Sequence, residues 1–329
     1  VGSVTIKNKV EIKGNKTQVD AALVGASAAT ITEAGTKATV SNAASLSEAN
    51  AIAAATNITA TFSAGLSDSV GNLTKDSTTI ADKMAAVTTD QSNIDIAISD
   101  GAGVTVEATR LEAIGKATGG TVSVAAAIKV EDSADNLTAA FVTEGVTATS
   151  AAVTVSDADN ADITASKLSD LGKAVGTVTV KNAVKVEAAA SALTAAFVTT
   201  TSAVTATTAK VTYSDANDVA LTAAEINAVG DAVGTVTLKN AVKVSGDKTA
   251  LTKAFVTTST AVTGTTAKVT FTDADNAAVN ATEITDVSSA VGSVTIKNKV
   301  EIKGNKTQVD AALVGASAAT ITEAGTKAT

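Results

Sequence analysis

The chain has 329 residues, and its 25 lysines and arginines against 33 aspartates and glutamates give a formal net charge of −8. This negative charge argues against a nucleic acid partner, and the absence of cysteine and histidine excludes a Ser-His-Asp triad, a cysteine nucleophile and imidazole or thiolate metal ligands. No apolar run approaches the roughly 18 residues of a membrane helix, so no membrane insertion is expected.

A long exact repeat dominates the sequence. Residues Val1–Thr39 recur without a mismatch as Val291–Thr329, 290 positions later. An identity of this length indicates duplication, so we expect a tandem array whose ends here fall inside a repeat. The sequence predicts one continuous repeat array over residues 1–329, with a 290-residue super-repeat (1–290) and the start of the next copy (291–329).

A shorter period lies inside the super-repeat, marked by a polar residue after each alternating apolar run. These markers are Asn42, Asp100, Asp157, Asp215 and Asp273, spaced by 58, 57, 58 and 58 residues. Five such units make one super-repeat, and each reads as two half-units of about 29 residues. The unit that contains Asn57–Asp95 has drifted from the pattern.

The first half-unit is predicted to be a strand, a turn and a short helix. Val211 and Tyr213 alternate with Thr212, which is typical of a half-buried strand. Thr222 with Glu225 predicts a capping box at the helix start, and Asn280 with Glu283 repeats it. Apolar residues spaced i, i+3, i+7 predict one helical face at Leu168/Leu171/Val175, Ile226/Val229/Val233 and Ile284/Val287/Val291.

The second half-unit alternates again at Thr177–Val180, and Lys181–Asn182 then predicts a corner before a short extended piece, Val184–Val186. A short helix should follow, with Leu193 and Phe197 on one face. The equivalent pairs are Leu137/Phe141, Leu251/Phe255 and Val19/Leu23.

A half-unit is too short to fold alone, because it buries only one face of a strand and a helix. We therefore predict an α/β repeat solenoid of about 29-residue strand-turn-short-helix coils, stacked into parallel β-sheets with two coils per unit. Helices pack more widely than strands, so either the solenoid curves or alternate coils place their helices on different sides. The strict alternation of the two half-units favours the second arrangement. The competing fold is a string of small independent domains.

The acidic turns after the strands are the candidate metal sites. Alternating oxygen ligands in a tight turn suit a hard cation such as calcium. The alternative is that Asp and Asn occur there because they favour turns and helix starts. The candidate calcium ligands are Asp157, Asp159, Asn160, Asp162, Asp215, Asn217, Asp218, Asp273, Asp275 and Asn276. No other cofactor is expected.

Threonines at the outward strand positions predict ladders on the stacked sheets. They are Thr154, Thr212 and Thr270 in the first half-units, and Thr179, Thr237 and Thr295 in the second. Such ladders order water in ice-binding solenoids. The alternative is that Thr suits a solvated strand face.

The segments ITASKLSDLGKAVGTVTV (Ile163–Val180) and LTAAEINAVGDAVGTVTL (Leu221–Leu238) resemble repeats of giant, cysteine-free cell-surface proteins of marine cyanobacteria. The resemblance implies an envelope-associated protein connected with extracellular filaments, adhesion or non-flagellar swimming. It transfers no functional residue.

Because acidic residues recur at equivalent repeat positions instead of converging on one cleft, we expect no enzyme. The sequence favours an extracellular or cell-surface structural protein that forms a filament, stalk or coat, self-associates through repeat stacking or lateral contacts, and is attached to the envelope outside residues 1–329. The alternatives are the spacer of a giant bacterial adhesin and, third, an ice-binding threonine ladder.

Overall fold

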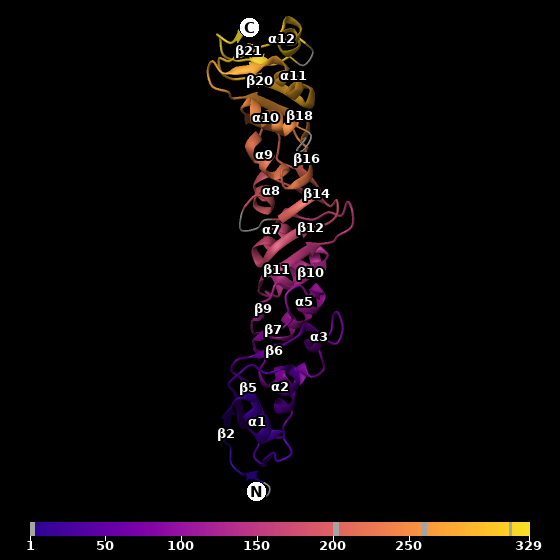
Figure 1. Cartoon of the computed structure of the whole chain (residues 1–329), viewed down its shortest axis with the longest axis vertical. Helices are drawn as coiled ribbons and strands as arrows, with labels where there is room; N and C mark the ends of the chain where they lie inside the picture. The colour runs from indigo at the N-terminus through magenta and orange to yellow at the C-terminus, as the bar shows by residue number, and fades with distance from the viewer. Residues whose placement is uncertain (1–3, 200–203, 258–261, 316–317) are drawn as a thin grey trace. The chain divides into compact units, whose positions relative to one another are not determined.

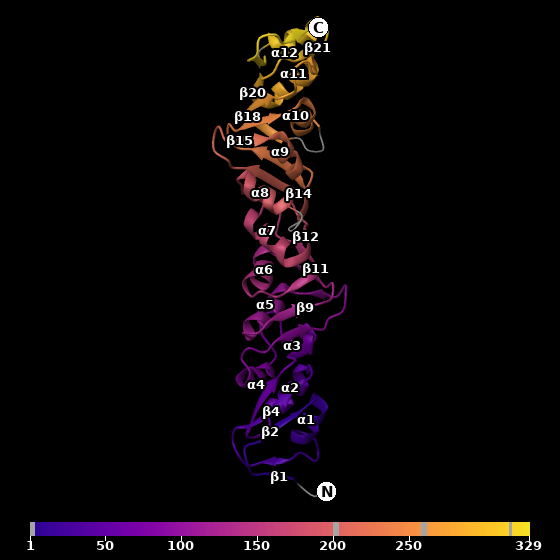
Figure 2. The same cartoon turned by 90° about the vertical axis from the view of Figure 1, so that its left-hand side faces the viewer.

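The computed structural model describes residues 4–199, 204–257, 262–315 and 318–329 (Figure 1, turned by 90° in Figure 2). The chain packs into two compact units. Unit 1 comprises Val1–Val155 with Ala174–Thr177, and unit 2 comprises Ser156–Lys173 with Val178–Thr329. Each is an α/β structure of short helices and mostly parallel strands in stacked sheets, so the predicted α/β class and parallel sheets are confirmed.

Unit 1 contains short helices and strands that alternate along the chain. Its helices are α1 Lys16–Leu23, α2 Leu46–Ala53, α3 Val70–Leu73, α4 Met84–Asp90, α5 Ala108–Ala117 and α6 Ala134–Thr138, followed by the π-helical turn η1 Ala139–Thr143. Its strands are β1 Thr5–Ile6, β2 Glu11–Gly14, β3 Thr30–Ile31, β4 Thr36–Val40, β5 Ile58–Phe62, β6 Leu66–Asp68, β7 Ile96–Ile98, β8 Thr105–Val106, β9 Val122–Val124, β10 Lys129–Asp132 and β11 Ala148–Val155.

Unit 2 repeats one arrangement more regularly. Its helices are α7 Ala165–Ala174, α8 Ala190–Phe197, α9 Ala223–Gly230, α10 Lys248–Phe255, α11 Ala281–Ala290 and α12 Lys306–Leu313. Its strands are β12 Val175–Val180 (of which Val175–Thr177 belong to unit 1), β13 Lys185–Ala188, β14 Val204–Tyr213, β15 Ala220–Thr222, β16 Val233–Leu238, β17 Lys243–Gly246, β18 Val262–Phe271, β19 Ala278–Asn280, β20 Val291–Ile296, β21 Glu301–Lys303, β22 Thr320–Ile321 and β23 Lys327–Ala328.

The alternating strands and the second helices are as predicted. In β14, Val211 and Tyr213 are buried at 1% exposure while Lys210 is exposed. In α8, Leu193 and Phe197 are buried as a pair. The core of each half-unit therefore comes from every second strand residue and one helical face.

Helix starts are fixed by the predicted capping boxes. The Thr222 N–H donates to Glu225 Oε2 at 2.9 Å, and Glu225 N donates back to Thr222 Oγ1 at 3.2 Å. The Asn280 N–H likewise donates to Glu283 Oε2 at 2.8 Å. These bonds satisfy amides that have no partner inside the helix.

Two details of the first half-unit differ from prediction. A short strand (β15 or β19) separates the turn from the helix. The third apolar residue of each predicted helical face also opens the next strand, as Val233 opens β16. It is buried at 6% exposure because the chain turns directly from helix to strand there.

Strands of unit 2 pair with strands of the next half-unit in parallel register. One series of cross-strand neighbours is Val186, Val211, Val236 and Val262, the next is Leu221, Val244, Val269 and Val294, and a third is Val279, Ile302 and Ala328. The second and third series begin 58 residues apart, at Leu221 and Val279. Each repeat unit therefore begins a new series of paired strands beside the earlier series, which continues.

Consecutive helices pack against one another from α8 to α12, so the expectation that alternate coils place their helices on different sides is wrong. Figure 1 shows α9 beside β16 and α10 beside β18, as their contacts require. Many buried helix positions are small, including Ala196, Ala223, Gly230 and Ala254. Small side chains let neighbouring helices approach more closely than ordinary helix spacing.

The drifted unit around Asn57–Asp95 carries two helices, α3 and α4, joined by a loop in place of one helix. Phe62, Leu66, Val70 and Met84 are nevertheless all buried at 3% exposure or less. The inserted loop shifts the sequence register without emptying the core, which explains why this unit does not align residue by residue.

Candidate functional site

Nine of the ten candidate calcium ligands lie in three turns at equivalent positions of the repeat, which we name the acidic turns. They are Ser156–Ala161, Ser214–Val219 and Thr272–Ala277. The tenth, Asp162, lies just after the first turn, where its backbone pairs with Lys185. The structure therefore groups the candidates as the sequence does, and the partners of each side chain indicate what the turn does.

One residue of each acidic turn has a left-handed backbone. Asp218 has φ 65° and donates its N–H to Ala241 O at 2.9 Å. Asn160 (φ 63°) and Asn276 (φ 62°) occupy the same position. Asn and Asp tolerate this conformation better than other residues that carry a side chain, so the backbone alone favours them here.

The acidic turn is clamped to the Lys-Asn corner of the next half-unit by two reciprocal hydrogen bonds. Asn217 Oδ1 accepts from Ala241 N at 2.9 Å, and Asn240 Nδ2 donates to Asp215 O at 2.7 Å. We name this pair of bonds the corner clamp. Equivalent bonds are Ala183 N to Asp159 Oδ1 (2.8 Å), Asn182 Nδ2 to Asp157 O (2.7 Å), Lys299 N to Asp275 Oδ1 (3.1 Å) and Asn298 Nδ2 to Asp273 O (2.8 Å).

The marker residues cap helices of the preceding half-unit. Asp215 Oδ2 accepts from Ala190 N, the first amide of α8, at 2.9 Å across 25 residues. The adjoining N-cap residue, Ala189, makes no side-chain cap bond. Further bonds of this kind, the cross-repeat caps, join Asp273 to Lys248 N (3.0 Å), Asp100 to Val70 N (2.7 Å), Asp68 to Leu46 N (2.9 Å) and Asn42 to Lys16 N (2.7 Å).

Sequence reasoning found the markers but missed both roles. It assigned Asn182 only to a corner, gave no role to the equivalent Asn240 and Asn298, and overlooked Asp68. The available signal was the recurring separation of 25 residues between each corner Asn and the preceding marker, visible in Asn240 and Asp215. A fixed separation of about one half-unit indicates a contact between neighbouring coils.

The strand lysines beside the acidic turns have different polar partners in different repeat units. Lys243 and Lys268 are direct cross-strand neighbours, and Asp218 Oδ1 lies 3.5 Å from the first ammonium and 2.8 Å from the second. The hydrogen bond from Lys268, with the charges of both lysines, lowers the pKa of Asp218. Without this carboxylate the two like charges would repel each other.

In the preceding repeat unit Asn160 stands at the position of Asp218, and the aspartate lies two residues later, at Asp162. Lys185 and Lys210 are again cross-strand neighbours, but Asn160 replaces the aspartate and accepts from Lys210 Nζ at 2.8 Å. Asp162 pairs through its backbone with Lys185.

Burial changes the pKa of one marker residue, Asp273. Asp273 is 7% exposed, and this burial, reinforced by the charge of Asp247, raises the pKa of its carboxyl although the bond from Lys248 N opposes the change. A buried carboxylate needs partners, and the first amide of α10 supplies one.

No group of three or more Asp or Glu side chains in the described residues is placed to hold a metal ion. Asp159, Asp215, Asp273 and Asp275 each use a carboxylate oxygen to accept a backbone N–H. Calcium takes six to eight oxygen ligands, which these turns would have to collect from groups already bonded to protein. Calcium binding at the acidic turns stays a prediction.

Threonine ladders exist in register. Thr212, Thr237 and Thr263 are successive cross-strand neighbours, and Thr270, Thr295 and Thr320 form a second row. Lys243 and Lys268 occupy the adjacent row two residues earlier on the same face. Long charged side chains beside the hydroxyls interrupt the flat surface that ice binding requires, and this activity also stays a prediction.

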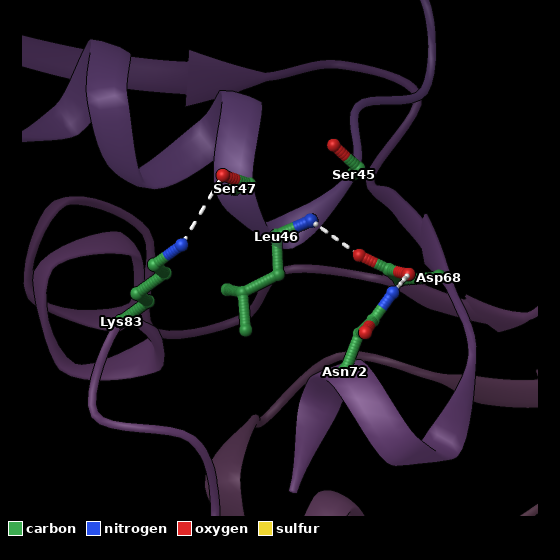
Figure 3. A pocket seen from close by; sticks show the side chains of 6 residues that line it. All are labelled: Ser45, Leu46, Ser47, Asp68, Asn72 and Lys83. Carbon is green, nitrogen blue, oxygen red and sulfur yellow. Dashed lines mark hydrogen bonds between the residues drawn. The ribbon is translucent and has the colours of Figure 1, made fainter.

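A pocket of about 210 Å³ near α2 and α3 collects several polar groups (Figure 3). Its buried carboxylate, Asp68, accepts from Leu46 N at 2.9 Å and from Asn72 Nδ2 at 2.7 Å. Lys83 Nζ donates to Ser47 Oγ at 3.2 Å, and both residues are exposed. A serine nucleophile needs a base that removes its proton. This lysine instead donates to the hydroxyl from a solvated position.

No protein-family model matches the chain, and no curated protein matches it either. None of the helices in the described part of the chain combines the length and apolar character of a bilayer span.

Proposed function

We propose that this chain is a structural protein, a tandem-repeat solenoid that builds an extracellular filament, stalk or surface coat and performs no catalysis. The observation that best supports this proposal is that polar residues of the turns and corners form hydrogen bonds within the protein. The markers and corner asparagines bond to the neighbouring half-unit, as Asp215 does to Ala190 and Asn240 does to Asp215.

Polar groups of this kind favour a load-bearing role. Half-units of unit 2 are joined by parallel strand pairing, and corner clamps and cross-repeat caps alternate from one junction to the next. Pulling the coils apart would break several of these bonds together. Repetition of one interface is how solenoid proteins gain length at constant stability per repeat.

Location and assembly belong to the same proposal. The resemblance of Ile163–Val180 and Leu221–Leu238 to repeats of giant bacterial surface proteins supports a secreted array that is fixed to the cell envelope outside residues 1–329. The absence of cysteine is common among such proteins, which fold without disulfides.

The test is immunogold electron microscopy of intact cells that make the protein, with an antibody against residues 1–39. Labelled filaments or a labelled coat are expected. Gold found only inside permeabilised cells would overturn the proposal. Gold confined to a stalk below an unlabelled terminal domain would favour the adhesin spacer instead.

A further inference from the structure

The junction between β5 and β6 differs from the four equivalent junctions of the repeat, which lie between β9 and β10, β12 and β13, β16 and β17, and β20 and β21. Two sets of parallel backbone pairs cross each of those four junctions. Across the junction after β5, the isolated bridge between Ala44 and Leu66 is the one parallel pairing among the described residues. Strands β2, β4 and β5 therefore form one sheet, and β6, β7 and β9 form another.

The junction between β9 and β10 shows what a regular junction supplies. Val122 and Val124 of β9 occupy the repeat positions of Ala60 and Phe62 in β5. Val124 N donates to Thr147 O at 2.8 Å, and Thr147 N donates back to Val122 O at 2.9 Å. One residue of the following half-unit thus both accepts from the strand and donates to it, as parallel pairing requires.

Side chains occupy this place at β5. Ala60 N donates to Asp90 Oδ2 at 2.7 Å, and Phe62 N donates to Gln91 Oε1 at 2.7 Å. Helix α4 ends at Asp90, and the residues from there to β7 contain no strand. A carboxylate only accepts hydrogen bonds, so Asp90 cannot donate to a carbonyl group of β5 as the backbone of a paired strand would.

Other polar contacts across this junction also use side chains. Asp68 Oδ2 accepts from Leu46 N at 2.9 Å, and Lys83 Nζ donates to Ser47 Oγ at 3.2 Å (Figure 3). Helix α4 packs on α2 and on β5. Helix packing and side-chain bonds therefore hold this junction together, and backbone pairing is limited to one bridge.

We propose that the junction between β5 and β6 is a yielding joint, which opens under tension before the regular junctions and lengthens the array while its neighbours stay folded. Interfaces in a repeat array contribute separately to stability, so opening begins at the weakest one. Side chains that rotate can release Ala60 N and Phe62 N one at a time. Backbone pairs that lie in register resist tension together.

The yielding joint would protect the regular junctions. At a fixed extension, the length that the joint releases lowers the tension on the rest of the array, so the corner clamps and cross-repeat caps would stay intact. This inference rests on the load-bearing role in the proposed function, and it adds a place at which the load is relieved.

The test pulls on the full chain through two introduced cysteines at a time, and the sequence has none of its own. Thr61→Cys with Ala97→Cys brackets the joint, and both positions are exposed. Ser123→Cys with Thr154→Cys brackets the junction between β9 and β10 at the same repeat positions and is the matched control. In optical tweezers at equal force, we expect the first pair to open at least about tenfold faster, because it lacks return bonds from a paired backbone.

Gln91→Ala separates the joint from a general weakness of unit 1. Loss of the acceptor for Phe62 N should speed the opening between positions 61 and 97 further and leave the control pair unchanged. Hydrogen exchange of the parent chain gives a readout without any substitution. After correction for intrinsic rates, the amide of Phe62 should exchange at least about tenfold faster than the amide of Val124.

Equal opening rates for the two cysteine pairs, or equal protection of the two amides, would overturn the yielding joint. A Gln91→Ala variant that opens no faster than its parent pair would do the same. Failure of the joint in a chain that still labels surface filaments would leave the proposed function standing. A fast joint in a chain confined to the inside of cells would overturn the proposed function and leave the joint as a measured property.

Discussion

Tyr213 is the chain's one tyrosine, and its hydroxyl oxygen is buried without a hydrogen-bond partner among the described residues. Burial, with the charges of Asp215 and Glu225, raises the pKa of this hydroxyl. The equivalent position in the next repeat unit holds Phe271, which is equally buried at 1% exposure. The next repeat unit therefore fills this buried position with a ring that lacks the oxygen.

We expect Tyr213→Phe to raise the free energy of unfolding by about 1 kcal/mol, because it removes an unsatisfied buried polar group and keeps the ring. Urea denaturation followed by circular dichroism measures the change. The reverse substitution Phe271→Tyr is the matched control and should lower stability. A loss of stability in Tyr213→Phe would show that the hydroxyl has a partner after all.

Asp273 gives a pH-dependent prediction. Its folded pKa is raised above the model-peptide value of 3.8, so ionisation weakens the fold as pH rises through the folded pKa. Asp273→Asn keeps an oxygen that accepts from Lys248 N, as Asn42 does from Lys16 N at 2.7 Å, and removes the buried charge. We expect the variant to melt higher than the parent at pH 7, with the difference vanishing below about pH 4.

Asp273→Ala is the control for the cap itself. It removes the charge and the acceptor together, so it should cost about 0.5–2 kcal/mol at acidic pH, where the raised pKa favours the protonated carboxyl of the parent. Thermal melts of the three proteins across pH 3–8 separate the two effects. An Asn variant less stable than the parent at pH 7 would mean that the charge contributes favourably to the cap.

At the scale of elements, the corner clamp carries a direct prediction. Asn240→Ala removes the donor to Asp215 O and leaves that carbonyl without its side-chain partner. We expect a loss of about 1 kcal/mol in the free energy of unfolding.

The neighbouring Lys239 supplies the control for the clamp. It is ion-paired with Glu187 at 2.5 Å, but both side chains are about half exposed. Exposed pairs contribute little, so Lys239→Ala should change stability by less than about 0.5 kcal/mol. Equal losses in the two variants would mean that the clamp adds nothing beyond surface packing.

Element type was predictable because strand and helix periods differ. Val211 and Tyr213 at alternate positions, and Leu193 and Phe197 four apart, identify their elements without any tertiary information. Helix placement was not predictable by the same means. The spacing argument treated helices as ordinary cylinders, whereas α9 and α10 pack against each other and bury small residues such as Gly230 and Ala254.

The chemistry of the candidate site was harder to predict than the fold. Asp and Asn in a turn are compatible with calcium, with a left-handed backbone and with capping, and the residue types alone do not decide. The hydrogen-bond partners of these side chains distinguish the possible roles. They lie in the neighbouring half-unit, as Ala241 does for Asn217. Only a comparison of separations between repeats would have pointed to them.

At the scale of the whole molecule, calcium removal is the simplest measurement. Because the turn oxygens already accept protein hydrogen bonds, we expect a chelator to leave the melting midpoint of the full chain unchanged. Magnesium added back to the chelated protein is the control for nonspecific ion effects. A fall of several degrees that calcium alone restores would establish the acidic turns as metal sites.

The cross-repeat cap joins the start of a helix to a residue that comes later in the chain, so it can form only after that residue has been made or exported. Helix α8 begins at Ala190, but the oxygen that holds its first amide belongs to Asp215, 25 residues further along. A polypeptide that leaves a ribosome or an export channel by its N-terminus presents the helix before the residue that completes it. Helices such as α8 and α10 therefore stay incompletely capped until the next half-unit has emerged, whereas α9 brings its own capping box with it.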